Sequence, residues 1–288
     1  MSRIAYVNGR YLVHADARVH IEDRGYQFAD GVYEAIGVFD GRLVDGGPHF
    51  DRLERSLAEL RIAPPMARRA LEFVVDEVIR RNHIGDGFIY FQVSRGVAPR
   101  NHPFPAHARP ALVVTARRHA FPDDPETLTG GRVVTQRDIR WERCDIKSLA
   151  LLPNVLAKEA AVSARAQESW MVDDDGFVTE GASTNAWIVD GEGTLVTRPT
   201  SNAILAGITR ATLLRLAREA GIAVAERPFT VAEAQRAREA FISSTTQIVK
   251  PITQIDDAVV GNGEPGSISR RLLGLYLAYA RAEARACA

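Results

Sequence analysis

A polar, turn-rich segment at residues 121–131 constrains what this chain can fold into. It reads FPDDPETLTGG, with two prolines and two glycines among acidic and hydroxyl side chains. Such a segment does not continue a helix or a strand and is typical of a linker between domains. A chain of 288 residues with 46% hydrophobic content can bury a sizeable core on each side of it. We therefore predict an α/β (α+β) protein with domains at 1–120 and 132–288.

The first 120 residues combine hairpin signals with amphipathic helices. Asn8-Gly9 and Asp40-Gly41 each lie between strand-like runs and predict tight hairpin turns. Apolar residues recur at spacings of three and four from Phe50 to Leu60, which predicts a helix that ends before Pro64-Pro65. A second helix is expected to run on to Asn82. Further strands are predicted at 88–95 and 111–115.

The second half of the chain mixes short strands with helices. Helices are predicted at 153–162, 209–220 and 267–280. In the last of them, Ile268, Leu272, Leu275 and Tyr279 lie on one apolar stripe. The expected strands are 132–136, 169–172, 185–189 and 240–242.

Charge and composition exclude several classes of function. The formal net charge is zero and there is no basic tract, so we expect no nucleic-acid partner. No apolar run is long enough to span a membrane, and no charged start leads into an apolar run, which predicts a cytoplasmic protein. Two cysteines, Cys144 and Cys287, do not make a disulfide framework. The histidines lack the ligand spacing of a metal site, so no metal is expected.

Lysine is rare in this chain. Only three of the 36 lysines and arginines are lysines: Lys147, Lys158 and Lys250. Lys158 lies on the polar face of a predicted helix beside Glu159, and Lys250 lies at a strand end. Lys147 stands between Ile146 and the apolar run SLALL, which should desolvate the amine and lower its pKa. A neutral amine is what a Schiff-base lysine requires, so Lys147 is the candidate nucleophile.

Two further segments could bind an anion. Gly207-Ile208-Thr209-Arg210 puts a glycine turn at the start of a predicted helix, where free N–H groups favour phosphate. Ser243-Ser244-Thr245-Thr246 offers consecutive hydroxyls at the end of a strand. Together with the amine candidate, these segments suggest a phosphorylated aldehyde cofactor.

Five segments carry a family resemblance in their order and spacing: YQFADGVYE at 26–34, the Lys147 segment, EGASTN at 180–185, GITR at 207–210 and SSTT at 243–246. With them the chain resembles, nearly end to end, the fold-type IV pyridoxal-phosphate aminotransferases. This family contains the D-amino acid and the branched-chain aminotransferases. The resemblance implies a small N-terminal α/β domain, a larger C-terminal pseudo-barrel domain and pyridoxal 5′-phosphate as the cofactor.

The resemblance also implies roles for individual residues. Lys147 would bind the cofactor aldehyde and then carry a proton at the substrate Cα, while Glu180 would keep the pyridine nitrogen protonated. Leu205 would pack on the ring face. The phosphate would be held by Arg52, Ile208, Thr209, Ser244 and Thr245.

Substrate choice depends on the loop that contains Arg100 and His102. An Arg-x-His pair can present two donors to one carboxylate, and it resembles the carboxylate-binding element of the D-amino acid aminotransferases, which acts with a tyrosine at the position of Tyr33. In that group the partner subunit supplies the loop, which implies a homodimer with composite sites. Ala182 departs from the serine that is frequent there, which leaves the hydrogen bonding on that side of the cofactor open.

The predicted function is therefore transfer of an amino group from a D-amino acid, such as D-alanine or D-glutamate, to 2-oxoglutarate or pyruvate in a ping-pong cycle. Three alternatives remain within the family: an L-branched-chain aminotransferase, an (R)-amine transaminase and an aminodeoxychorismate lyase. A non-catalytic protein that binds pyridoxal phosphate is a fourth. Retention of both Lys147 and Glu180 argues against the fourth, since binding alone does not need a proton-carrying amine.

Overall fold

The computed structural model describes residues 3–286, so Cys287 lies outside the described residues. The chain forms two compact units. Unit 1 comprises the chain up to Ala120, with Ile146–Ala150 and the chain from Ala280. Unit 2 comprises Phe121–Asp145 and Leu151–Tyr279.

Unit 1 is built on a six-stranded sheet with the order β2-β1-β6-β5-β3-β4. All neighbouring strands in it are antiparallel. Asn8 and Gly9, like Asp40 and Gly41, adopt positive φ in the two tight turns, which confirms both predicted hairpins. The strands are β1 (Ile4–Val7), β2 (Arg10–Val13), β3 (Gly31–Phe39), β4 (Arg42–Leu43), β5 (Gly87–Ser94) and β6 (Ala111–Arg118).

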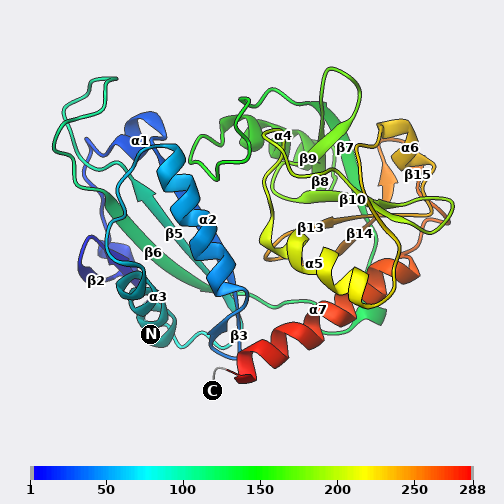
Figure 1. Ribbon diagram of the computed structural model, residues 1–288, viewed down its shortest axis with the longest axis horizontal. Helices are drawn as coiled ribbons and strands as arrows, with labels where there is room; N and C mark the ends of the chain where they lie inside the picture. Colours follow the sequence, from blue (N-terminus) through cyan, green and yellow to red (C-terminus); the bar gives the residue numbers. More distant parts are fainter. Residues whose placement is uncertain (1–2, 287–288) are drawn as a thin grey trace. The chain divides into compact units, whose positions relative to one another are not determined.

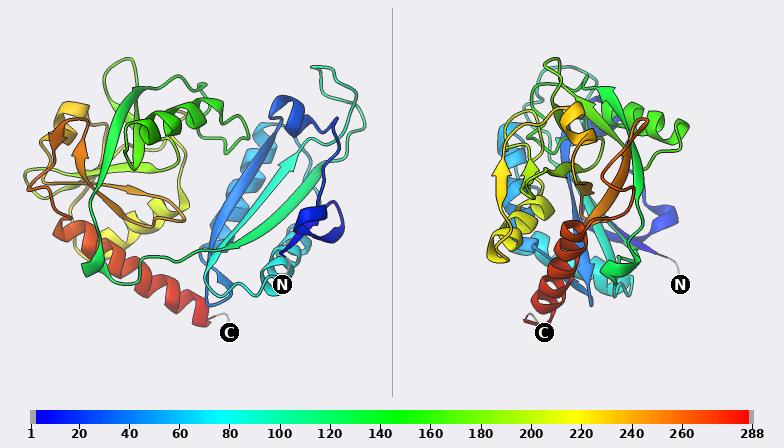
Figure 2. Two further views of the ribbon diagram at one scale, coloured as in Figure 1. Left: turned by 180° about the vertical axis from the view of Figure 1, so that it is seen from behind. Right: turned by 90° about the vertical axis from the view of Figure 1, so that its right-hand side faces the viewer.

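Two helices, α2 (Gly46–Glu59) and α3 (Arg68–Arg81), cover one face of this sheet. Helix α2 lies in front of the strands in Figure 1, and the strands lie in front of α2 when the unit is seen from behind in Figure 2. Alternate residues of β5, among them Ile89, Phe91 and Val93, point to the helices and are fully buried. The short helix α1 (Arg24–Phe28) precedes β3.

Unit 2 is built on a nine-stranded mixed sheet. Its main path runs β12-β11-β10-β13-β14-β7-β8-β9, and β15 pairs with β14. The pairs β7–β8, β7–β14 and β11–β12 are parallel. The strands are β7 (Gly131–Arg137), β8 (Glu168–Val172), β9 (Val178–Gly181), β10 (Asn185–Val189), β11 (Leu195–Thr197), β12 (Val224–Glu226), β13 (Glu239–Ser243), β14 (Lys250–Ile255) and β15 (Ala258–Val259).

The helices of this half include α4 (Leu152–Ser163), α5 (Ile208–Glu219), α6 (Val231–Gln235) and α7 (Ser267–Ala286). The positions of α4, α5 and α7 confirm the three predicted helices. Two short 3₁₀ turns, η1 (His14–Asp16) and η2 (Pro125–Thr127), also occur in the chain. All four residues of the predicted stripe lie in α7, where Leu272 is buried and Ile268, Leu275 and Tyr279 are half-buried. The buried side chains of α7 are Ser269, Leu272, Leu273, Tyr276, Leu277, Ala280 and Ala284.

No helix within the described residues is both long and apolar enough to cross a membrane.

Candidate active site

The Lys147 segment is fixed by pairing with the start of β3 in unit 1. The N–H of Tyr33 donates to the carbonyl of Lys147 at 2.9 Å, and the N–H of Leu149 donates to the carbonyl of Gly31 at 2.9 Å. Gly31 has to be a glycine, since a Cβ there would lie 2.5 Å from the carbonyl oxygen of Val93 and 2.8 Å from a methyl of Leu149. The backbone of the lysine therefore continues the edge of the sheet.

The side chain of Lys147 lies over an aromatic ring. Its Nζ is 4.2 Å from the centre of the Tyr33 ring, and that ring lies 5.6 Å from the ring of Tyr90. Within the described part of unit 1, no residue accepts a hydrogen bond from Nζ. The amine is half-buried and is held by an electrostatic contact with a π-face, which leaves its bonding directions available to another molecule.

Behind β3 lies a buried polar cluster made of Glu34, His49 and Arg52. Arg52 donates from Nε and Nη2 to the two oxygens of Glu34 at 2.8 and 2.7 Å, and His49 Nδ1 is 2.8 Å from Glu34 Oε2. Burial alone would raise the pKa of Glu34, but the charge and hydrogen bonds of Arg52 and the bond to His49 outweigh it and lower the pKa to about 2. Since Glu34 is therefore an anion and only accepts, His49 carries its proton on Nδ1.

His49 is also linked electrostatically to the lysine. Burial lowers the pKa of His49, the bond to Glu34 opposes this, and the charges of Arg52 and Lys147 lower the pKa further. His49 is accordingly a neutral imidazole whose Nε2 carries the lone pair. Arg52, which we expected at the phosphate, uses two of its nitrogens on Glu34 in this structure.

Arg24 holds the backbone of the loop that contains Arg100 and His102 by hydrogen bonds. Arg24 donates to the carbonyls of Asn101 at 2.5 Å and of His102 at 3.2 Å. The guanidinium of Arg100 lies 4.9 Å from the Phe28 ring centre, and the His102 ring lies 5.4 Å from it. The structure thus brings Arg100 and His102 together on one aromatic ring, with both side chains exposed.

In unit 2, Glu180 is buried at the end of β9 and accepts several hydrogen bonds. Its Oε1 accepts from Arg140 Nη1, and Asn185 Nδ2 donates to Oε2 at 3.1 Å. The N–H of Leu205 lies 3.1 and 3.2 Å from the two oxygens. Because the donors include a guanidinium, the carboxylate is held as a fixed negative charge.

Asn185 connects Glu180 with the two hydroxyl-rich segments, which are the candidate anion-binding segments 207–210 and 243–246. It pairs directly with Ser243 where β10 lies beside β13, so Ser244 and Thr245 follow at the same end of that strand. Its Nδ2 also donates to the carbonyl of Leu205 at 3.1 Å. Asn185 therefore ties together three regions that are far apart in the sequence.

The start of α5 offers a place for a phosphate. Among the described residues no side chain caps this helix at Gly207, so its first N–H groups have no such partner. Gly207 lies so close to Asn185 that a Cβ would stand 2.1 Å from Oδ1. Leu205, Ile208, Ser244 and Thr245 are half-buried and Thr209 is buried.

This donor set fits pyridoxal phosphate. Glu180 is a fixed anion of the kind that holds a protonated ring nitrogen, and a helix N-terminus with neighbouring hydroxyls suits a phosphate. Ser243 lies beside these hydroxyls, but its Oγ accepts a hydrogen bond from Trp187 Nε1 at 2.9 Å. The predicted residues divide between the units: Lys147, Tyr33, Arg52, Arg100 and His102 belong to unit 1, and Glu180, Leu205, Ile208, Thr209, Ser244 and Thr245 to unit 2.

Sequence reasoning gave no role to Asp138, Arg140 and Asn185, which the structure places in the hydrogen-bond network around Glu180. Arg140 is one of 33 arginines among the 36 basic residues, so nothing in its type sets it apart. Its spacing of two from Asp138 would place both side chains on one face of a strand, but does not by itself indicate an ion pair. Asn185 stood within a motif but without a role, although a buried amide after a β-strand is a signal of directed hydrogen bonding.

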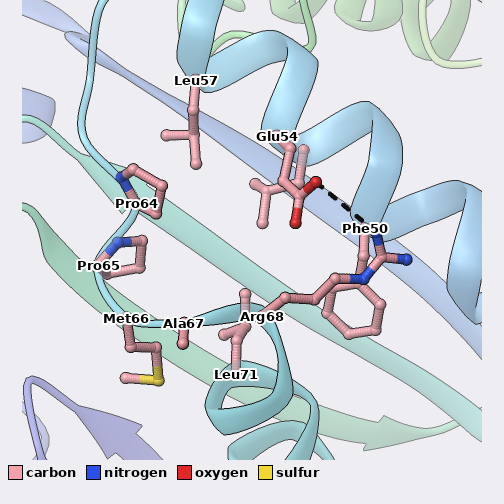
Figure 3. A pocket seen from close by; sticks show the side chains of 10 residues that line it. Phe50, Glu54, Leu57, Pro64, Pro65, Met66, Ala67, Arg68 and Leu71 are labelled. Atoms are coloured by element: carbon pink, nitrogen blue, oxygen red, sulfur yellow. Dashed lines mark ion pairs between the residues drawn. The ribbon is translucent and has the colours of Figure 1, made fainter.

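A pocket of unit 1 lies elsewhere, between α2, α3 and the turn at Pro64-Pro65 (Figure 3). Its walls are mostly apolar, and Arg68 stands at its edge with Nη1 3.7 Å from Glu54 Oε2. Neither Lys147 nor Tyr33 lines it, so the pocket is not assigned to the candidate active site.

Curated relatives are similar in sequence to this chain over nearly its whole length. A D-alanine aminotransferase of Staphylococcus haemolyticus is 42% identical over 268 residues, which cover 93% of this chain and 94% of the relative. A protein of the same name from Listeria innocua is 40% identical and covers 94% of each chain. Both similarities therefore extend far beyond the five motif segments.

Solved structures share the fold. A branched-chain amino acid aminotransferase from T.th., solved with pyridoxamine 5′-phosphate, superposes with a TM-score of 0.91 at 25% identity over 98% of this chain and 95% of that one. The Escherichia coli branched-chain aminotransferase gives a TM-score of 0.89 at 24% identity over 97% and 95% of the two chains. These matches confirm the predicted α/β fold class.

A family profile described as amino-transferase class IV matches residues 31–255, a range that begins with β3 and ends with β14. The matched range contains Lys147 and Glu180 and both hydroxyl-rich segments. The chain therefore belongs to the class IV aminotransferase family.

Proposed function

We propose that this protein is a D-amino acid transaminase that uses pyridoxal 5′-phosphate. It would move an amino group from a D-amino acid, such as D-alanine or D-glutamate, to a 2-oxo acid, such as 2-oxoglutarate or pyruvate, in two half-reactions. The observation that carries the proposal is the sequence identity of 39–42% to proteins named D-alanine aminotransferase along at least 92% of this chain.

Pyridoxal phosphate, the cofactor of this family, supplies an electron sink for charge that develops at the substrate Cα. Lys147 would anchor the aldehyde of the cofactor and then move the proton at Cα. Its position over the Tyr33 ring supports this role, because the amine is held without a hydrogen-bond acceptor of unit 1 among the described residues. Glu180 would hold the proton of the ring nitrogen, which is supported by the fixed negative charge described above.

The phosphate would bind at the start of α5 and at the end of β13. Ile208 and Thr209 would donate backbone N–H groups, and Ser244 and Thr245 their hydroxyls. Arg52 would supply a charge, with Glu34 holding its guanidinium in place. Leu205, whose N–H already donates to Glu180, would lie against the ring face.

The substrate carboxylate would be recognised by Arg100 and His102 together with Tyr33. Arg100 and His102 flank the ring of Phe28 and are exposed, so they can serve a site outside their own subunit. We therefore propose a homodimer with composite sites that works in the cytoplasm. Domains at 1–120 and 132–288, joined by the linker 121–131, complete the proposal.

A half-reaction tests the proposed function. Cofactor-loaded protein is mixed separately with D-alanine, L-leucine and (R)-1-phenylethylamine, and the visible absorbance of the bound cofactor is followed. Loss of this absorbance with D-alanine alone is the expected result. Loss with L-leucine would identify an L-branched-chain aminotransferase, and loss with the amine an (R)-amine transaminase. No loss with any of the three, together with release of pyruvate from aminodeoxychorismate, would identify the lyase.

A further inference from the structure

Glu180 is the end of a row of three charged side chains in unit 2. Arg140 donates from Nη1 to Glu180, and from Nε and Nη2 to the two oxygens of Asp138 at 3.0 and 2.7 Å. The side chains of Asp138, Arg140 and Glu180 are only 11%, 6% and 7% exposed. A row this deeply buried holds its members in one geometry, because each lost contact would leave a charge unpaired.

Additional hydrogen bonds fix both ends of the row. Thr179 Oγ1 lies 2.7 Å from Asp138 Oδ2, and Arg140 Nη2 donates to the carbonyl of Ala203 at 3.1 Å. Ala203 lies two residues before Leu205, whose N–H donates to Glu180. Arg140 thus joins β9 to the turn before α5, the two parts of unit 2 that hold Glu180.

The row also sets the charge beside Glu180. Burial opposes the charge of Arg140, but its bonds to Asp138 and the charge of Glu180 outweigh this and raise its pKa. Burial would raise the pKa of Asp138, yet Arg140 and Thr179 outweigh it and the pKa is lowered. Two carboxylates and one guanidinium sum to one negative charge. Without Asp138, Arg140 and Glu180 alone would sum to zero.

We infer that Asp138 is a positioning residue which acts through Arg140 to orient Glu180 and to keep one net negative charge facing the ring nitrogen of the cofactor. A proton on that nitrogen is stabilised by a net negative neighbour and destabilised when the neighbour becomes neutral. The inference rests on the proposed function, since it assumes that pyridoxal phosphate is bound beside Glu180.

The test follows the protonation of the ring nitrogen directly. Wild type and Asp138→Asn are loaded with pyridoxal phosphate labelled with ¹⁵N in the ring, and the ¹⁵N chemical shift is recorded from neutral to alkaline pH. In Asp138→Asn we expect the shift to move towards that of an unprotonated pyridine, with the apparent pKa lower by about one unit or more. Asp138→Glu, which restores the charge, should return the shift towards the wild-type value.

A matched control is Asp174→Asn. Asp174 forms an ion pair with Arg137, and both side chains are more than 70% exposed. Its loss should leave the ¹⁵N titration unchanged. An unchanged titration in folded, loaded Asp138→Asn would overturn the inference.

Thr179→Val covers the case in which Asp138→Asn does not fold. It removes the hydroxyl next to Asp138 Oδ2 without changing charge, and should move the ¹⁵N shift in the same direction by a smaller amount. No movement would overturn the inference here as well. If the wild type transaminates D-alanine but the ¹⁵N shift is the same in the variants, only the role of Asp138 is contradicted. A wild type that does not bind the cofactor defeats the proposed function as well.

Discussion

The Nζ atom of Lys147 lies 4.2 Å from the centre of the Tyr33 ring, and the N–H of Tyr33 donates to the carbonyl of Lys147 at 2.9 Å. One residue of β3 therefore fixes both the backbone and the side chain of the candidate nucleophile. A contact of this kind contributes about 0.5–2 kcal/mol and has a preferred direction. The lysine side chain is consequently oriented before any substrate arrives.

Replacement of Lys147 by alanine should abolish transamination and leave the fold intact. The reason is that the amines of the other two lysines bind elsewhere, Lys158 at Gln167 and Lys250 at Thr129, while the substitution removes only a half-buried side chain. Steady-state assays with D-alanine and 2-oxoglutarate, with circular dichroism as a check on folding, measure this. Lys250→Ala removes a lysine whose Nζ binds Thr129 instead, and it should retain activity. Residual turnover of Lys147→Ala near the wild-type rate would remove Lys147 from the mechanism.

Substitution of Arg100 by alanine should weaken recognition of the substrate carboxylate. Losing a charge-assisted hydrogen bond costs about 1.5–3 kcal/mol, which corresponds to roughly a 10- to 100-fold rise in KM for D-amino acids. Binding of the cofactor does not involve the substrate carboxylate and should be little affected, so the KM for D-alanine and the dissociation constant of pyridoxal phosphate are the two quantities to measure. Arg109→Ala, also an exposed arginine in this region, provides the control. An unchanged KM for D-alanine in Arg100→Ala would separate Arg100 from carboxylate recognition.

Local patterns predicted the elements, but not the contacts between distant residues. The turns at Asn8-Gly9 and Asp40-Gly41 were correct because positive φ is a local requirement. The most buried row of α7 could not be predicted, because apolar residues occupy several rows of this helix, and the partners against which it packs decide which row is buried. Lys147 was proposed through its rarity and its apolar neighbours, and its role stays a prediction.

The polar supports of the site illustrate the same limit. Glu34 and Arg52 are 18 residues apart, and Arg140 and Glu180 are 40 apart, so folding alone brings these charges together. A sequence with 36 basic and 36 acidic residues allows far too many such pairs to choose among. Their burial, which gives them their strength, is a property of the tertiary structure.

The buried pair of Glu34 and Arg52 predicts a pH dependence of stability. The pKa of Glu34 falls from an ordinary 4.5 to about 2 in the fold. Its stabilising contribution is therefore complete above pH 4.5 and is lost as the pH falls towards 2. Denaturant unfolding measured between pH 4.5 and 2 should show the free energy of unfolding of the wild type falling with pH. In Glu34→Gln the free energy of unfolding should depend less steeply on pH.

At neutral pH, Glu34→Gln should also lower the free energy of unfolding by about 3 kcal/mol or more, because the guanidinium of Arg52 stays buried beside a neutral partner. Glu72→Gln is the control, since Glu72 is a half-buried partner of Arg68 whose side chain is 41% exposed. A pH profile of Glu34→Gln that matches wild type would contradict the assignment of this acid-sensitive stability to Glu34.

Gly207→Ala should weaken cofactor binding through Asn185. The φ of Gly207 is −64°, which any residue adopts, so the backbone adds no strain. The new Cβ would lie 2.1 Å from Asn185 Oδ1, so Asn185 has to move and lose its bonds to Glu180 and to the carbonyl of Leu205. We expect the dissociation constant of pyridoxal phosphate, measured by absorbance titration, to rise roughly tenfold or more.

A double-mutant cycle identifies the cause of this loss. In an Asn185→Ala background the obstacle is gone, so Gly207→Ala should add little further effect and the two substitutions should be strongly non-additive. Gly191→Ala, where a Cβ meets nothing within 4 Å, should bind the cofactor as wild type does. Additive effects of Gly207→Ala and Asn185→Ala would mean that the glycine acts independently of Asn185, because a shared steric cause requires that removing one partner abolishes the effect of the other.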